Sequence, residues 1–293
     1  VRTFATDGWI RHLRWWAKPK LLLAGCLDEK LIAFDETGAR RWTFISEMGP
    51  EVYAAAKQYE FKEGPGRAGI HGLTTGVFLN GEEQCFAGGA CTLEIVNERG
   101  ELVKRKPLFW GCGNVFQFVP RPDGSIDLLV AREPNDGHYV WVVNNKDLST
   151  RRAFSGVPAG HTYVGGAETM ARDHLFHVDV DGDGTKEIVS EINGRWNRVT
   201  IWNEEGNALY NAQFGPGDSI PVRNMRDLDI IDLDGDGRLE IITATSGGIL
   251  VALDCECRKV WSVRLPSPAA QLTTISIGET PAIVVACDNG DVL

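Results

Sequence analysis

The sequence predicts an all-β fold made of about six repeated units, and three observations lead to this prediction. Short apolar runs alternate along the chain with turns rich in Gly, Asn and Asp, which is typical of β-hairpins. A polar anchor residue recurs every 47 to 62 residues at the end of an apolar run. The 293 residues include 33 Gly and only 3 Met, which favours turns over long helices. Repeats of about 50 residues with several strands each are typical of the blades of a β-propeller.

The anchor residues define the repeat. Asp35 ends the apolar run LIAF, and Trp42 follows it by seven positions. Asp254 ends the run LVAL, and Trp261 follows it at the same distance. The same frame fits three further pairs, which are Asn97 with Lys104, Asn144 with Arg151, and Asn203 with Tyr210. A second apolar strand is expected upstream of the anchor at residues 21–25, 186–190, 239–243 and 282–286.

The frame also sets the expected domain organisation. The chain stops just before a sixth anchor is due, and residues 1–4 resemble the strand that follows an anchor. We therefore expect one propeller domain over residues 1–293, either a six-bladed ring without its closing turn or a fragment of a seven- or eight-bladed ring. Residues 45–75 form an insertion, with a helical run from Glu51 to Tyr59 after Pro50. Such an insertion either shapes a binding site or is a surface elaboration without function.

An acidic motif occurs twice, about one repeat apart. Residues 179–187 and 232–240 both read Asp-x-Asp-x-Asp-Gly-x-x-Glu, and a strand follows each. Calcium prefers six to eight oxygen ligands, and carboxylates at alternate positions converge when the chain curls tightly. The closing acid comes too early for an EF-hand, and no helix follows. The predicted ligands of two calcium ions are the side chains of Asp179, Asp181, Asp183, Glu187, Asp232, Asp234, Asp236 and Glu240, with the backbone carbonyls of Thr185 and Arg238.

Bound calcium would have a structural role in these loops. Nearly all the predicted ligands are protein groups, so no open position is left for catalysis. Two ions would change the formal charge from −10 to about −6 and relieve repulsion between closely spaced aspartates. The alternative is a pair of polar hairpin turns without metal.

The two motifs carry resemblances to known repeats. The acidic loops resemble those of FG-GAP and VCBS repeats, calcium-bearing blades similar to those of integrin-type propellers. The Asp35/Trp42 and Asp254/Trp261 hairpins resemble PQQ-like propeller repeats, although the three middle anchors are Asn. The resemblance implies a propeller fold and calcium. Propellers of this kind are mostly exported and serve adhesion, glycan binding or, in some lineages, polysaccharide cleavage.

Charge and cysteine content narrow the function. A net charge of −10 argues against binding to duplex nucleic acid or to an anionic membrane, and no apolar run reaches the ~20 residues of a membrane helix.

Cys26 and Cys287 occupy the same repeat position and are expected in the core. Cys85 and Cys91 are candidates for a disulfide. The pair formed by residues 255 and 257 is a candidate for metal binding or for pairing elsewhere. No two cysteines are adjacent, so a bound quinone is not expected.

Loop residues suggest a competing enzyme hypothesis. His161, Tyr163, His138 and Arg195 lie in loops expected on one face of the propeller. Together they suit a polysaccharide lyase acting on uronic acids, in which the arginine neutralises the carboxylate and His or Tyr moves protons. Rhamnogalacturonan-lyase-like propellers are similar in placing a His shortly before a calcium loop, as His174 stands before residue 179. The alternative is that these residues satisfy turns and packing.

Seven tryptophans lie outside the anchor frame, at positions 9, 15, 16, 110, 141, 196 and 202. Such residues either stack on sugar faces or belong to the core.

Taken together, the repeats, the acidic loops and the resemblance lead us to expect an exported, extracellular or periplasmic, calcium-stabilised propeller. Its leading function is recognition of a polysaccharide or a cell-surface protein, with β-elimination of uronic-acid glycans as the alternative. We expect a monomer without membrane insertion.

Overall fold

The computed structural model describes residues 3–48, 50, 69–89, 91–108, 112–132, 138–155, 174–192, 198–214 and 225–293. The chain divides into two compact units, Val1–Asp136 with Val140–Ala153, and Gly137–Tyr139 with Phe154–Leu293. The single domain expected over 1–293, with its insertion at about 45–75, stays a prediction. The helical run expected from Glu51 to Tyr59 lies outside the described residues.

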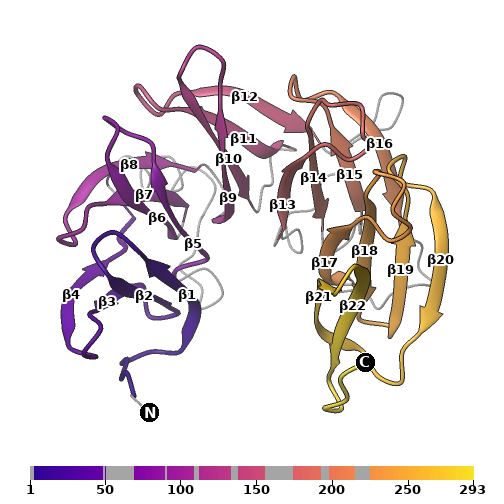
Figure 1. The fold of residues 1–293 in the computed structure, drawn as a ribbon. Helices are drawn as coiled ribbons and strands as arrows, with labels where there is room; N and C mark the ends of the chain where they lie inside the picture. Colours follow the sequence, from indigo (N-terminus) through magenta and orange to yellow (C-terminus); the bar gives the residue numbers. More distant parts are fainter. Residues whose placement is uncertain are drawn as a thin grey trace. The chain divides into compact units, whose positions relative to one another are not determined.

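The predicted all-β propeller fold of about six blades is confirmed (Figure 1). In the described part of the chain, five sheets have four strands and one has two, and the strands of each sheet follow sequence order. Neighbouring strands within a sheet are antiparallel, as in the first sheet. Each sheet is one blade. Among the described residues, no helix is long and apolar enough to span a membrane.

The first unit contains blade 1, blade 2 and most of blade 3. Blade 1 comprises β1 (Ile10–Trp16), β2 (Leu21–Cys26), β3 (Lys30–Phe34) and β4 (Arg40–Ile45). Blade 2 comprises β5 (Gly72–Val77), β6 (Glu83–Gly89), β7 (Thr92–Val96) and β8 (Leu102–Pro107). Blade 3 comprises β9 (Gly113–Pro120), β10 (Ile126–Arg132), β11 (His138–Asn144) and β12 (Thr150–Ser155).

The second unit contains blades 4 to 6. Blade 4 comprises β13 (Leu175–Val178), β14 (Glu187–Ile192), β15 (Arg198–Trp202) and β16 (Ala208–Gln213). Blade 5 comprises β17 (Met225–Ile231), β18 (Glu240–Thr245), β19 (Ile249–Leu253) and β20 (Lys259–Arg264). Blade 6 comprises β21 (Ala269–Ile277) and β22 (Thr280–Cys287).

Burial explains the sequence pattern of the strands. The middle strands of a blade are covered on both faces, so β3 and β15 are apolar or buried at nearly every position. The outer strands β4 and β20 are mostly exposed, and only Trp42 and Phe44 in β4 and Trp261 in β20 are partly or fully buried. Continuous apolar runs therefore mark middle strands, as they do in any sheet covered on both faces.

The anchor residues close the turn between the third and fourth strands. The Asp35 Oδ1 atom accepts hydrogen bonds from the backbone N–H groups of Thr37 (2.9 Å) and Ala39 (3.1 Å). The Asn97 Oδ1 atom accepts the equivalent pair from Arg99 (2.9 Å) and Glu101 (3.0 Å). The turn requires one side-chain oxygen and no charge, which explains why Asn replaces Asp in the middle blades.

Aromatic residues of the outer strands pack on the anchor turn of the next blade. The Trp42 Nε1 atom donates to the Glu98 carbonyl oxygen at 2.9 Å, and its ring covers Gly100, where a Cβ would lie 2.7 Å from a ring carbon. Phe154 covers Gly206 in the same way. Within the first unit, Phe4 lies against Gly38. Glycine is required at positions 100 and 206 because a Cβ there would displace the aromatic ring, whereas a Cβ on Gly38 would lie in ordinary contact with Phe4, at 3.6 Å.

The cysteines are core residues. Cys26 and Cys287 are buried, as expected. The disulfide considered between Cys85 and Cys91 is wrong, because Cys85 is a free thiol. The two residues are separated by most of β6, a strand that rises about 3.3 Å per residue, whereas a disulfide needs Cα atoms within about 7 Å. Cys257 packs in the core of the second unit, where burial raises the pKa of its thiol to about 12 and disfavours a metal-binding thiolate.

Candidate metal centres

The first acidic loop connects β13 to β14 and is curled around its first aspartate. Asp179 accepts backbone hydrogen bonds from Gly182 (2.8 Å) and Gly184 (2.8 Å), one on each carboxylate oxygen. Both glycines have positive φ values, 77° and 89°. Glu187, the first residue of β14, accepts a bond from the backbone N–H of Val180 at 3.0 Å and so folds the loop back on the strand.

The second loop, between β17 and β18, repeats these bonds. Asp232 accepts from the backbone of Gly235 (2.7 Å) and Gly237 (3.0 Å). Glu240 accepts from the backbone of Leu233 at 2.8 Å. The two loops therefore have the same conformation at the same place in neighbouring blades.

Three carboxylates converge in each loop. One carboxylate oxygen from each of Asp179, Asp181 and Glu187 lies within 4.8 Å of the other two, and Asp232, Asp234 and Glu240 form the matching group. The grouping does not include Asp183 or Asp236. The Oδ1 atoms of these two residues accept backbone bonds from Thr185 (2.6 Å) and Arg238 (2.8 Å).

The charge of each group is uncompensated inside the loop. Glu187 is buried, and burial followed by the charges of Asp181, Asp183 and Asp179 raises the pKa of its carboxyl. Burial and the neighbouring aspartates raise the pKa of Glu240 in the same way. A carboxyl whose pKa is raised by its neighbours marks a place where a proton or a cation is favoured.

The two loops are also bonded to each other. The backbone N–H of Leu239 donates to the Val180 carbonyl oxygen at 2.9 Å. A Cβ on Gly182 would lie 2.9 Å from the Gly237 carbonyl oxygen, so the two turns touch. The acidic loops therefore form one strongly negative surface across blades 4 and 5.

His174 joins the same two blades through side chains. Its Nδ1 atom lies 3.1 Å from Glu191 Oε1, and its Nε2 atom lies 2.7 Å from Asp227 Oδ1. Asp227 in turn accepts the backbone N–H of Leu272 in β21 at 2.7 Å, which extends the chain of bonds to blade 6. Burial disfavours the charged imidazole, but the two carboxylates outweigh it and raise the pKa of His174 well above 6.5. His174 is thus a charged link between blades.

The lyase candidates lie almost entirely outside the described residues. His161, Tyr163 and Arg195 belong to segments that the structure does not describe, and His138 is described only as the first backbone position of β11. Of the tryptophans outside the anchor frame, Trp16 and Trp202 are buried, whereas Trp9 is 83% exposed. The assignment of His161, Tyr163, His138 and Arg195 to catalysis stays a prediction.

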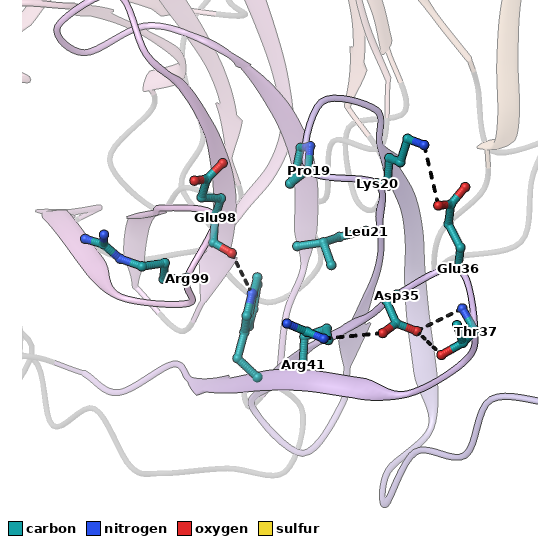
Figure 2. A pocket seen from close by; sticks show the side chains of 10 residues that line it. Pro19, Lys20, Leu21, Asp35, Glu36, Thr37, Arg41, Glu98 and Arg99 are labelled. Carbon is teal, nitrogen blue, oxygen red and sulfur yellow. Dashed lines mark hydrogen bonds and ion pairs between the residues drawn. The ribbon is translucent and has the colours of Figure 1, made fainter.

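A pocket of about 710 Å³ lies between blades 1 and 2 and was not expected from the sequence (Figure 2). Lys20 faces Glu36 at 3.6 Å, and Arg41 faces Asp35 at 3.6 Å. Its basic and acidic side chains are mostly exposed and balance one another, which gives the pocket no preference for a charged ligand.

The comparisons with known proteins agree with this architecture. A family model for the FG-GAP-like repeat matches residues 179–243, which contain both acidic loops. No curated protein matches the chain.

The chain is similar to solved structures of low sequence identity. One is the crystal structure of BBS1N in complex with ARL6DN, soaked with lead, with a TM-score of 0.59 and 12% identity over 99% of this chain and 79% of that chain. The mercury-soaked crystal gives a TM-score of 0.56 and 13% identity over 94% and 74% of the chains. A chain of the mitotic checkpoint complex gives a TM-score of 0.59 and 11% identity over 98% and 74%. At these identities the likeness shows the fold alone.

Proposed function

We propose that this chain is an exported, calcium-stabilised β-propeller that serves as a recognition module, with a polysaccharide or a cell-surface protein as its partner. The observation that carries the proposal is the repeated convergence of carboxylates, in which Asp179, Asp181 and Glu187 approach within 4.8 Å and the next blade repeats the group. A propeller with FG-GAP-like repeats supports recognition in general.

The donor set fits calcium better than the other common divalent ions. Each group offers carboxylate oxygens and no His or Cys, which disfavours zinc and copper. Calcium accepts six to eight oxygens in flexible geometry, whereas magnesium demands a small octahedron and retains its waters. The carboxylates of Asp183 and Asp236 and the carbonyls of Thr185 and Arg238 lie in the same turns and are the further ligands we propose.

Calcium would stiffen the second unit without reacting. The loops already touch through the Leu239–Val180 hydrogen bond, so neutralising both strengthens the contact between blades 4 and 5. Extracellular calcium modules bind calcium with a Kd of about 10⁻⁴–10⁻³ M, and sites of this strength suit a protein located outside the cell or in the periplasm.

The partner is tested by binding to immobilised polysaccharides and cell-surface proteins, with free calcium or with a chelator present. We expect binding in calcium and a marked loss in chelator, because the calcium-free propeller is less stable. If partner binding is the same in both buffers, calcium is not coupled to recognition. If calcium leaves the unfolding temperature unchanged, the metal part of the proposal fails.

Lyase activity is not proposed beside recognition. No described contact favours it, since His161, Tyr163 and Arg195 lie outside the described residues.

A further inference from the structure

The first strand of several blades carries a β-bulge near its beginning, which re-aims one side chain. In blade 1, Ile10 pairs with Cys26 and His12 pairs with Gly25, so Arg11 is the extra residue. In blade 5, Met225 pairs with Thr245 and Asp227 pairs with Ala244, so Arg226 is the extra residue. Bulges of this kind are frequent next to functional sites because they turn a side chain out of the regular alternation.

The same position is arginine in both blades, but only one arginine has a carboxylate partner. Arg226 pairs with Asp288 at 3.3 Å. Among the residues that the structure describes, no carboxylate pairs with Arg11, which is half-buried. A guanidinium is always charged and its forked donors match a carboxylate, so Arg11 lacks, among the described residues, the counter-anion that Asp288 provides for Arg226.

Two histidines surround Arg11. The Arg11 Nη1 atom lies 3.1 Å from the Nδ1 atom of His71, the buried residue that precedes β5 in the next blade. Because a guanidinium only donates, His71 accepts on Nδ1 and its neutral ring carries the proton on Nε2. One N–H of Arg11 is used in this way, and no other side chain among the described residues bonds its guanidinium.

His12 adds an unsatisfied polar atom beside the same group. Its Nε2 atom is buried and has no hydrogen-bond partner. Burial, followed by the charge of Arg11, lowers the pKa of His12, so its ring is neutral near pH 7. The cluster of Arg11, His12 and His71 therefore carries one positive charge, which matches one carboxylate; a phosphate dianion usually recruits more than one cation.

An exposed aromatic ring stands two positions before Arg11. Trp9 is 83% exposed, although its backbone is fixed by a bond from the Leu27 N–H to the Trp9 carbonyl oxygen at 2.9 Å. A large indole left in water on an ordered backbone is suited to stack on a flat apolar surface such as a sugar face.

We propose that Arg11, held in place by its hydrogen bond to His71, binds the carboxylate of a uronic-acid residue in an acidic polysaccharide, and that Trp9 packs against a sugar ring of the same polysaccharide. The proposal rests on the proposed recognition function and names its ligand class. A single local cation is needed for this ligand because the protein as a whole has a net charge of −10 and repels polyanions.

The test is isothermal titration calorimetry, in which a short galacturonate oligosaccharide is added to the whole chain in buffer with saturating calcium and the affinity is measured. The variants are Arg11→Gln and Trp9→Ala. Matched controls are Arg14→Gln, an exposed arginine on the same strand, and Trp15→Ala, whose side chain is 48% exposed. We expect affinity to fall about tenfold or more in both test variants and to stay within about twofold in both controls, because a charge-assisted bidentate contact and a stacking surface are removed.

Several results would overturn the proposal. These are equal affinity of Arg11→Gln and the unmodified chain, equal binding of the neutral galactose oligosaccharide, or stronger competition by inorganic phosphate than by galacturonate. If Arg11→Gln does not fold, Trp9→Ala decides, since Trp9 is almost entirely in water. If galacturonate does not bind while neutral polysaccharides bind in calcium, the proposed carboxylate site is refuted and the proposed recognition function is not.

Discussion

Neutralising one carboxylate of an acidic loop should have opposite effects with and without calcium. Asp181→Asn removes a charge but keeps an Oδ1 acceptor for the backbone N–H of Asp183, which lies 3.2 Å away. Asp234→Asn makes the same change in the second loop. Glu205→Gln removes a charge from an exposed turn of the same unit and is the control.

The magnitude follows from the spacing of the carboxylates. Asp181 lies within 4.8 Å of two other carboxylates, and each such pair repels by about 0.9 kcal/mol even at the dielectric constant of water. Without calcium, Asp181→Asn should therefore raise the free energy of unfolding by about 1–2 kcal/mol. With calcium at a hundred times its Kd, each occupied site contributes about 2.7 kcal/mol, and the variant should lose most of this.

Urea unfolding in chelator and in calcium measures both effects. We expect the variant to be more stable than the unmodified chain in chelator and less stable in calcium. Glu205→Gln should change by less than about 0.5 kcal/mol in either buffer. A shift of the same sign in both buffers would refute the reasoning, because it would show that the carboxylates do not share a cation.

Two further predictions concern contacts between blades. His174 has a raised pKa in the folded chain, so the stability that its charge contributes is fully present below about pH 6.5. This stability is lost as the pH rises from about 6.5 through the folded pKa. The free energy of unfolding should therefore fall by up to about 1.4 kcal/mol per pH unit in that range. His174→Gln should remove this slope in urea unfolding at a series of pH values, and an unchanged slope would assign it to another group. Gly100→Ala should cost about 1–3 kcal/mol more than Gly124→Ala in thermal unfolding, since both glycines have φ near +80° but only Gly100 faces a ring, that of Trp42. Equal costs would show that the Trp42 contact is not tightly packed.

Features that are local in sequence could be predicted from it. The anchor turns and the acidic loops are each closed by bonds spanning at most seven residues, as between Asp35 and Ala39 or Val180 and Glu187. The residue pattern of these turns and loops therefore predicts their conformation directly. The strand pattern was readable for the same reason, because burial on both faces leaves an apolar run.

Contacts between blades could not be read in this way. Trp42 meets Glu98, 56 positions along the chain, and Arg11 meets His71, 60 positions along. Such pairs depend on how two sheets pack, which no short motif encodes. Aligning the first strands of the blades would have placed Arg11 and Arg226 at one position, but only the structure shows that Asp288 satisfies one of them. The Cys85–Cys91 bridge failed for a related reason, since sequence proximity hid the length of an intervening strand.

The number of calcium ions bound per chain tests the central claim most directly. Equilibrium dialysis at a free calcium concentration that saturates the unmodified chain, with the metal counted by atomic absorption, should give two ions. Asp181→Ala and Asp234→Ala should each give one, and the double variant should give none. No bound calcium in the unmodified chain, or two ions still bound in the double variant, would contradict the account.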